Sequence, residues 1–363
     1  MKFIKTYRHL SIEDTNLLKG ISILLIGFHN FYRNIPPHFG ENEFYFNSNF
    51  LTDWIAYISQ KPFEIFIAIF SFLGHYGVSA FVLISGYGLA MGFKNKEIPL
   101  FTYFASRVKK IYPTFFLGVV LAIVIALAIH RYPTQHELWE SVFWKLSLLS
   151  PFRADMMYAL YGPWWFFGLI FHLYALFPLL LFLLKRNHLV LFWGLLSILF
   201  VLPHTNLIQT SANYYASALY QLPLFGLGVF LGYQKELYLP KHVVYLALFL
   251  LLYGQGNFVI WKFTHVSAAI LIVLLVLYVR EKQWKFNKIM IACGILSFHF
   301  FVIHPVIRAP FLLFAEYVNS IYFTTFFGLV YIAIAYLAAI LFRKIDNKFR
   351  ELLTNMGKML NKS

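Results

Sequence analysis

His29 lies near one end of the first long apolar segment of the chain, residues 17–31. An ionisable side chain at membrane depth is costly, so it marks a candidate functional site. Histidine titrates near neutral pH, and it can take the proton from an alcohol that is about to act as a nucleophile. Arg107, Lys109 and Lys110 form a basic block. Because Arg107 and Lys110 are three residues apart, they would share one helix face and could bind a polyanion such as the phosphates of a nucleotide-containing cofactor.

Composition determines the class of protein that must position these side chains. Of the 363 residues, 60% are hydrophobic and 12% are charged, whereas a soluble domain carries roughly a quarter charged residues. A run of about 20 apolar residues crosses a bilayer as a helix, which satisfies its own backbone hydrogen bonds. We therefore predict an all-α polytopic membrane protein of about ten transmembrane helices, formed by a single integral-membrane domain over residues 1–363. The ten predicted spans cover residues 14–33, 74–93, 111–130, 164–184, 189–205, 217–233, 242–256, 263–279, 289–308 and 320–342.

Two further stretches are too short or too polar to count as spans. Residues 63–72 precede the second span, and residues 138–149 mix apolar side chains with charged and hydroxyl ones. Both are predicted to lie in the membrane interface or to form half-spans.

Lysine and arginine determine the predicted orientation. With the N-terminus in the cytoplasm, 23 of the 30 basic residues lie on the cytoplasmic side, whereas the 15 acidic residues divide almost evenly. This positive-inside pattern predicts that both termini are cytoplasmic, with a short tail from about residue 343, in a multi-pass protein of the inner (cytoplasmic) membrane. The net charge of +15 is then a topology signal with some attraction to membrane lipid, and it requires no nucleic acid. The same pattern would explain Arg107 and Lys110 without any ligand.

Four histidines fall in the predicted outer half of the membrane, namely His29, His75, His172 and His304. A histidine there can be satisfied by neighbouring helices, and we assign His75 and His172 to packing. To act as a base, His29 must be partly neutral, which burial favours and a nearby carboxylate opposes. Glu64 is the only carboxylate that we can name as its partner.

Four segments carry recognisable motifs. Residues 17–29 (LLKGISILLIGFH) combine a basic residue, a small residue, an apolar run and a histidine, and residues 77–87 (GVSAFVLISGY) form a glycine-rich apolar helix. Residues 104–113 (FASRVKKIYP) place basic residues before an aromatic and a proline, and residues 296–305 (LSFHFFVIHP) end in His-Pro. In this order and at these spans they resemble the acyltransferase-3 family of integral-membrane proteins. Its members move acetyl or other acyl units from a cytoplasmic donor onto sugars of cell-surface glycans.

The resemblance implies an O-acyltransferase in which His29 is the catalytic histidine and acetyl-CoA or another acyl-CoA is the donor, with no metal. The acceptor would be a hydroxyl of a surface glycan or lipid-linked sugar, and its ring would stack on Trp164 or Trp165. We expect His304 and Ser297 to orient the imidazole of His29 or to polarise the thioester carbonyl.

The donor is expected to enter over Arg107 and Lys110 and to present its thioester near the catalytic histidine. We also assign Lys19 and Ser85 to donor binding. Ser85 precedes Gly86, a pattern that favours close helix packing and that alternatively leaves room for a pantetheine-like arm.

The chain departs from the family pattern at two places. Nine residues separate Lys19 from His29, where the family has ten between an arginine and the histidine, so the two side chains point about 80° apart around a helix. Ile170 and Phe171 stand where the family has glutamates, so the usual carboxylate partner is absent from that position.

Two other classes of function stay open. A transporter, flippase or polymerase for lipid-linked glycans would share the many helices and buried histidines, although such proteins more often show repeats or intramembrane charges. A non-catalytic relative used for interactions is the other alternative. The acyl group, the acceptor glycan and the oligomeric state do not follow from the sequence.

Overall fold

The computed structural model describes residues 9–35, 40–200, 214, 216–234, 236, 241–318 and 320–360. Within these residues the regular structure is entirely helical, with no strand. Each predicted span coincides with a helix, although residues 201–205 of the fifth span lie outside the described residues, as do the basic residues of the N-terminal segment. These ten helices are α1 (Ile12–Tyr32), α4 (Tyr76–Phe93), α5 (Leu100–Ala128), α7 (Trp165–Arg186), α8 (His188–Phe200), α10 (Ala218–Tyr233), α11 (Lys241–Gly254), α13 (Thr264–Glu281), α14 (Lys285–Val318) and α15 (Ile321–Leu360).

Six helices of the described part are long and apolar enough to cross a membrane, namely α4, α5, α7, α13, α14 and α15. The protein is therefore a multi-pass membrane protein. Shorter apolar helices α8, α10 and α11 stand beside them. The count of about ten crossings and the cytoplasmic placement of both termini stay predictions.

The stretch before the second span is a sharply bent helix pair. Helix α2 (Asn49–Gln60) is followed by the one-turn helix η1 (Pro62–Glu64) and α3 (Ile65–Leu73), with a bend of 116° between the two parts. The bend falls at Lys61, which precedes a proline and is held out of the helical conformation with φ −131° and ψ 65°. The pair is thus a broken span or a re-entrant loop, close to the predicted half-span.

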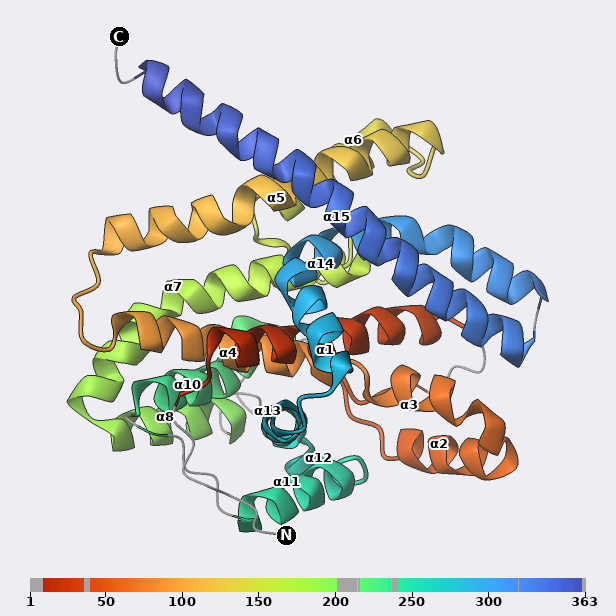
Figure 1. Cartoon of the computed structure of the whole chain (residues 1–363), viewed down its shortest axis with the longest axis horizontal. Coiled ribbons are helices and arrows are strands. Elements are labelled where there is room, and N and C mark those ends of the chain that lie inside the picture. Colours follow the sequence, from red (N-terminus) through yellow and green to blue (C-terminus); the bar gives the residue numbers. More distant parts are fainter. Residues whose placement is uncertain are drawn as a thin grey trace.

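Helix α1 lies in the middle of the molecule (Figure 1). Its contact with α14 is the most extensive between any two of the described helices. Two glycines permit this contact. A Cβ atom on Gly20 would lie 1.8 Å from the carbonyl oxygen of Met290, and one on Gly294 would lie 1.8 Å from that of Asn16. Only glycine therefore allows the two backbones to approach so closely. This contact fixes the position of His29 along the axis of α1 relative to the residues of α14.

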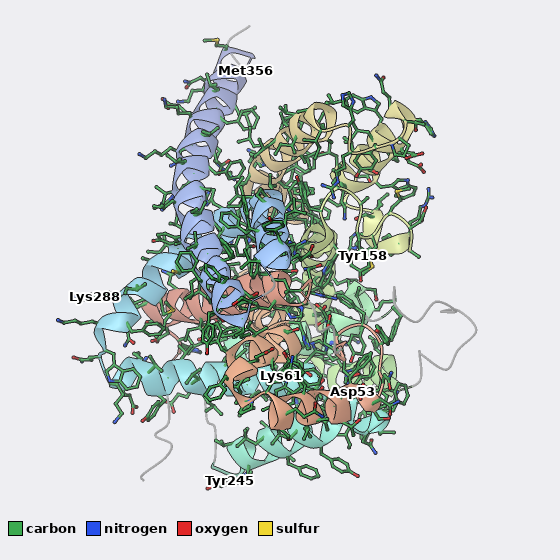
Figure 2. The ribbon with its side chains drawn as sticks, turned by 90° about the vertical axis from the view of Figure 1, so that its right-hand side faces the viewer. Asp53, Lys61, Tyr158, Tyr245, Lys288 and Met356 are labelled. Carbon is green, nitrogen blue, oxygen red and sulfur yellow. The ribbon has the colours of Figure 1, made fainter. Side chains whose placement is uncertain are left out.

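Helix α15 continues well beyond the predicted end of the last span at residue 342. It crosses the molecule diagonally in Figure 1, and its C-terminal end extends past the other helices. Met356, labelled in Figure 2, lies near that end. Residues 343–360 of the tail that we predicted from about residue 343 are a continuation of this helix, and the last three residues lie outside the described part of the chain.

Candidate active site

His29, in the last turn of α1, lines a cavity of about 240 Å³. We call this space the histidine cavity. Helices α1, α4, α7 and α14 and the segments before α2 and α7 contribute to it. Its polar and aromatic lining includes His29, Asn30, Arg33, Glu43, Phe44, His75, Tyr158, Trp165 and Arg308.

The backbone determines the tautomer of His29. Its Nδ1 atom lies 3.0 Å from the carbonyl oxygen of Ser71 and 3.3 Å from that of Phe70. Carbonyl oxygens only accept hydrogen bonds, so Nδ1 must carry the proton and Nε2 is the free lone pair of the neutral ring. Arg33 donates to Nε2 through Nη1 at 3.2 Å. The imidazole is therefore oriented with its basic nitrogen toward the cavity.

Glu43 is the carboxylate beside this imidazole. Its Oε2 atom lies 3.8 Å from Nε2 of His29 and accepts a hydrogen bond from Nη1 of Arg33 at 2.9 Å. Burial would raise the pKa of Glu43, but its interaction with the nearby imidazole of His29 and the charge of Arg33 outweigh burial and hold the pKa at about 2. Glu43 is thus an anion at neutral pH, placed to stabilise an imidazolium.

Glu64, the only partner of His29 that we could name from the sequence, does not take this role. Its Oε1 atom lies 3.8 Å from Nζ of Lys61, at the bend between α2 and α3. Glu43 escaped the sequence analysis because it belongs to the loop after α1 and not to an apolar segment. Distant residues hold that loop in place: Asn42 donates to the carbonyl of Gln255, and the indole of Trp261 donates to the carbonyl of Asn42.

His29, Glu41 and Glu43 place possible ligand atoms within 4.8 Å of one another. The positive charge between the two carboxylates is already supplied by Arg33, whose guanidinium pairs with both. A metal ion would have to displace that guanidinium, so the described geometry favours an ion-pair network at this place.

A second cavity, of about 360 Å³, lies further toward the N-terminal end of α1. We call it the basic cavity. Lys19, Ser85 and Lys110 line it, so three of the four residues assigned to donor binding come together. Arg107 is adjacent, with its guanidinium carbon 5.9 Å from the centre of the Tyr174 ring, which also lines the cavity.

The basic block is held in place by an arginine of α15, which binds a backbone carbonyl that a proline of α5 leaves without a donor. Pro113 has no N–H, so it leaves the carbonyl of Lys109 without its helical donor. Arg350 on α15 supplies the missing donor, with its Nη1 atom 2.7 Å from that oxygen. Asp346 in turn accepts a hydrogen bond from Nε of Arg350 at 3.0 Å, so α15 fixes the segment that carries Lys110.

The two cavities are separated by apolar side chains. Ile26 and Phe301 line both. Lys19 and His29 are ten residues apart on α1, or about 15 Å along the helix axis. The two side chains point about 80° apart around the helix, and they line different cavities. They therefore do not meet at one point.

The structure does not bring His304 and Ser297 to His29. Ser297 lines the basic cavity, whereas His304 is buried on α14, donates through Nδ1 to the backbone of its own helix and lines neither cavity. The backbone carbonyls of α3, and not these side chains, orient the imidazole. His75, which we assigned to packing, has its ring centre 5.5 Å from that of His29 and lines the histidine cavity.

Of the other residues that the sequence analysis singled out, some line a cavity and the others are packed in the interior. Trp165 lines the histidine cavity, whereas Trp164 is fully buried and donates to the carbonyl of Val302. His172 packs against the ring of Phe152, away from both cavities. Ile170 forms part of the wall of the basic cavity.

Residues 12–343 match the acyltransferase-3 family model, which is described as an acyltransferase domain. No curated protein and no solved structure matches the chain.

Proposed function

This chain belongs to the acyltransferase-3 family, and we propose that it moves an acetyl or other short acyl group from acyl-CoA to a hydroxyl group of a glycan. The observation that carries the proposal is the pairing of the His29 imidazole with the buried carboxylate of Glu43, at one side of an apolar wall, with a cavity lined by Lys19 and Lys110 at the other.

The basic cavity is the proposed donor site. Lys19 and Lys110 line it and Arg107 stands beside it, which suits the phosphates of coenzyme A. Ser85 and Ser297 offer hydroxyl groups along the same cavity, beside the proposed path of the pantetheine arm. In the predicted topology this cavity faces the cytoplasm, where acyl-CoA is made.

The histidine cavity is the proposed acceptor site. Phe44, Tyr158 and Trp165 give it aromatic walls against which the CH faces of a sugar can pack. The acceptor is then a surface glycan or lipid-linked sugar that reaches the cavity from the outer side of the cytoplasmic membrane.

In the proposed reaction, Nε2 of His29 removes the hydroxyl proton as the acceptor oxygen attacks the thioester carbonyl. The new C–O ester bond forms, the C–S bond breaks, and the departing thiolate takes the proton back from the imidazolium. Glu43 stabilises the imidazolium through its charge. Arg33 must first release Nε2, so binding of the acceptor hydroxyl is coupled to movement of that guanidinium.

The test is release of free thiol from acetyl-CoA by the purified full-length protein in a membrane mimic. We expect His29→Ala to abolish turnover while acetyl-CoA still binds, and Arg107→Ala to weaken acetyl-CoA binding. His172→Ala is the matched control, because that histidine lies outside both cavities. If the wild-type protein binds no acyl-CoA, and if His29→Ala leaves the acylation of the cell's glycans unchanged, a transport or interaction role replaces the enzyme.

A further inference from the structure

Arg308 on α14 has a charge that no described carboxylate balances. It lines the histidine cavity, and it forms no ion pair within the part of the chain that the structure describes. Its one hydrogen bond there runs from Nη1 to the carbonyl oxygen of Asn30, at 2.6 Å. A guanidinium has five N–H donors in a planar fork, so most of this group remains available to a ligand in the cavity.

A second arginine lies close by. Arg131, which follows α5, stacks on the ring of Tyr161 with 4.7 Å between its guanidinium carbon and the ring centre. Its charge and that of Arg33 both act on Arg308. Glu41 and Glu43 compensate Arg33, whereas no ion pair engages Arg131 among the described residues. Two positive charges near the cavity are therefore unmatched.

The contact with Asn30 places Arg308 beside the base. Asn30 directly follows His29 on α1, and both residues line the same cavity. A group bound by the free side of the Arg308 fork would thus share this cavity with His29. Trp165 and Tyr158 form an aromatic wall of the same cavity. Tyr158 is labelled in Figure 2.

We propose that the acceptor glycan is acidic and that Arg308 binds its carboxylate or phosphate group while a hydroxyl of the same unit faces His29. This inference rests on the proposed function and names its substrate class. The planar fork of arginine matches both kinds of oxyanion. An anion would balance the charges of Arg308 and Arg131, which a neutral sugar would leave uncompensated.

Arg308 also has a structural role that the test must separate from ligand binding. The carbonyl of Asn30 is one of the last of α1 and has no backbone donor, so the guanidinium of Arg308 and the side-chain amide of Asn34 cap it together. Arg308→Lys keeps the positive charge, and Arg308→Gln keeps a hydrogen-bond donor. Size-exclusion elution and thermal unfolding would show whether each variant folds.

The first measurement is thermal stabilisation of the full-length protein in a membrane mimic by D-glucuronate, glycerol 1-phosphate or D-glucose, at matched ionic strength. We expect one of the two anions to raise the unfolding temperature at concentrations where glucose does not, and Arg308→Gln to lose this effect. Which anion acts distinguishes a uronic acid from a phosphate-containing acceptor. Arg153→Gln is the control, because Arg153 already pairs with Glu140 and Asp155. Equal stabilisation by glucose, or an anion effect that survives in Arg308→Gln, would overturn the proposal.

The second measurement is acetyl-CoA thiol release with the same three acceptors. We expect the KM for the anionic acceptor to rise about tenfold or more in Arg308→Gln, since a charge-assisted hydrogen bond is lost, with the KM for acetyl-CoA unchanged. Equal use of glucose and glucuronate would refute the acidic acceptor alone. Stabilisation by anions that depends on Arg308, together with no thiol release from any acceptor, would instead refute the transferase function.

Discussion

The sharpest prediction concerns Glu43→Gln, which removes a charge from beside the imidazole of His29, the proposed base, and keeps the size of the side chain. Two unit charges 3.8 Å apart attract by about 4 kcal/mol at an effective dielectric constant of about 20. Arg33 lies nearer to the same carboxylate and shares its field, so we assign about 2 to 3 kcal/mol of this attraction to the imidazolium of the transition state. That loss corresponds to a decrease in kcat of roughly 30- to 160-fold.

The assay is thiol release from acetyl-CoA at saturating donor. Glu41→Gln is the matched control, since Glu41 lies in the same loop and pairs with Arg33. It removes a carboxylate that does not contact the imidazole and leaves Glu43 in place, so its kcat should change by less than about threefold. A Glu43→Gln variant that folds and retains more than a third of the wild-type kcat would show that Glu43 only holds the loop.

The pKa of the same carboxylate gives a pH-dependent stability. Its value of about 2 in the folded protein lies below the ordinary value of 4.5, so the carboxylate stabilises the fold above about pH 4.5, and this contribution is lost as the pH falls toward 2. The difference corresponds to about 3 kcal/mol. Thermal unfolding of wild type and Glu43→Gln between pH 2 and 7 should converge at the acidic end. Parallel curves would contradict the assigned pKa.

Three further perturbations test the frame around the site. Gly20→Ala should prevent folding or greatly lower the unfolding temperature, because the new Cβ would meet a backbone oxygen at 1.8 Å, whereas Gly88→Ala, with nothing within 4 Å, should be harmless. Burial lowers the pKa of Lys145 to about 7, so the folded protein binds fewer protons than the unfolded chain between about pH 7 and 10.5. The stability of the fold should therefore rise with pH across this window. Lys145→Met should flatten that rise in a pH series of unfolding temperatures. Arg350→Ala leaves the carbonyl of Lys109 without a donor, so acetyl-CoA titrations should show weaker binding by several-fold at an unchanged kcat.

The helices were predictable because long apolar runs in lipid have few alternatives to a helix. The contacts between side chains of different helices and loops were harder to predict from the sequence. Ser297 and His304 are two turns apart on α14, about 10 Å along the axis, so both could not serve one imidazole, yet sequence alone does not say which of them faces a cavity. Glu43 was missed because loop residues are positioned by tertiary contacts, here with Gln255 and Trp261, more than 200 positions away in the chain.

The apolar wall of Ile26 and Phe301 has a consequence for the energetics of the cell. In the predicted topology the two cavities open to opposite faces, and a continuous watery path between them would conduct protons and dissipate the membrane potential. Apolar side chains between the cavities oppose this leak, since an ion pays a large solvation penalty in apolar surroundings. In the proposed reaction the uncharged acyl group is the only part of either substrate that needs to pass the wall, so the proposed enzyme would export acyl units without conducting ions across its membrane.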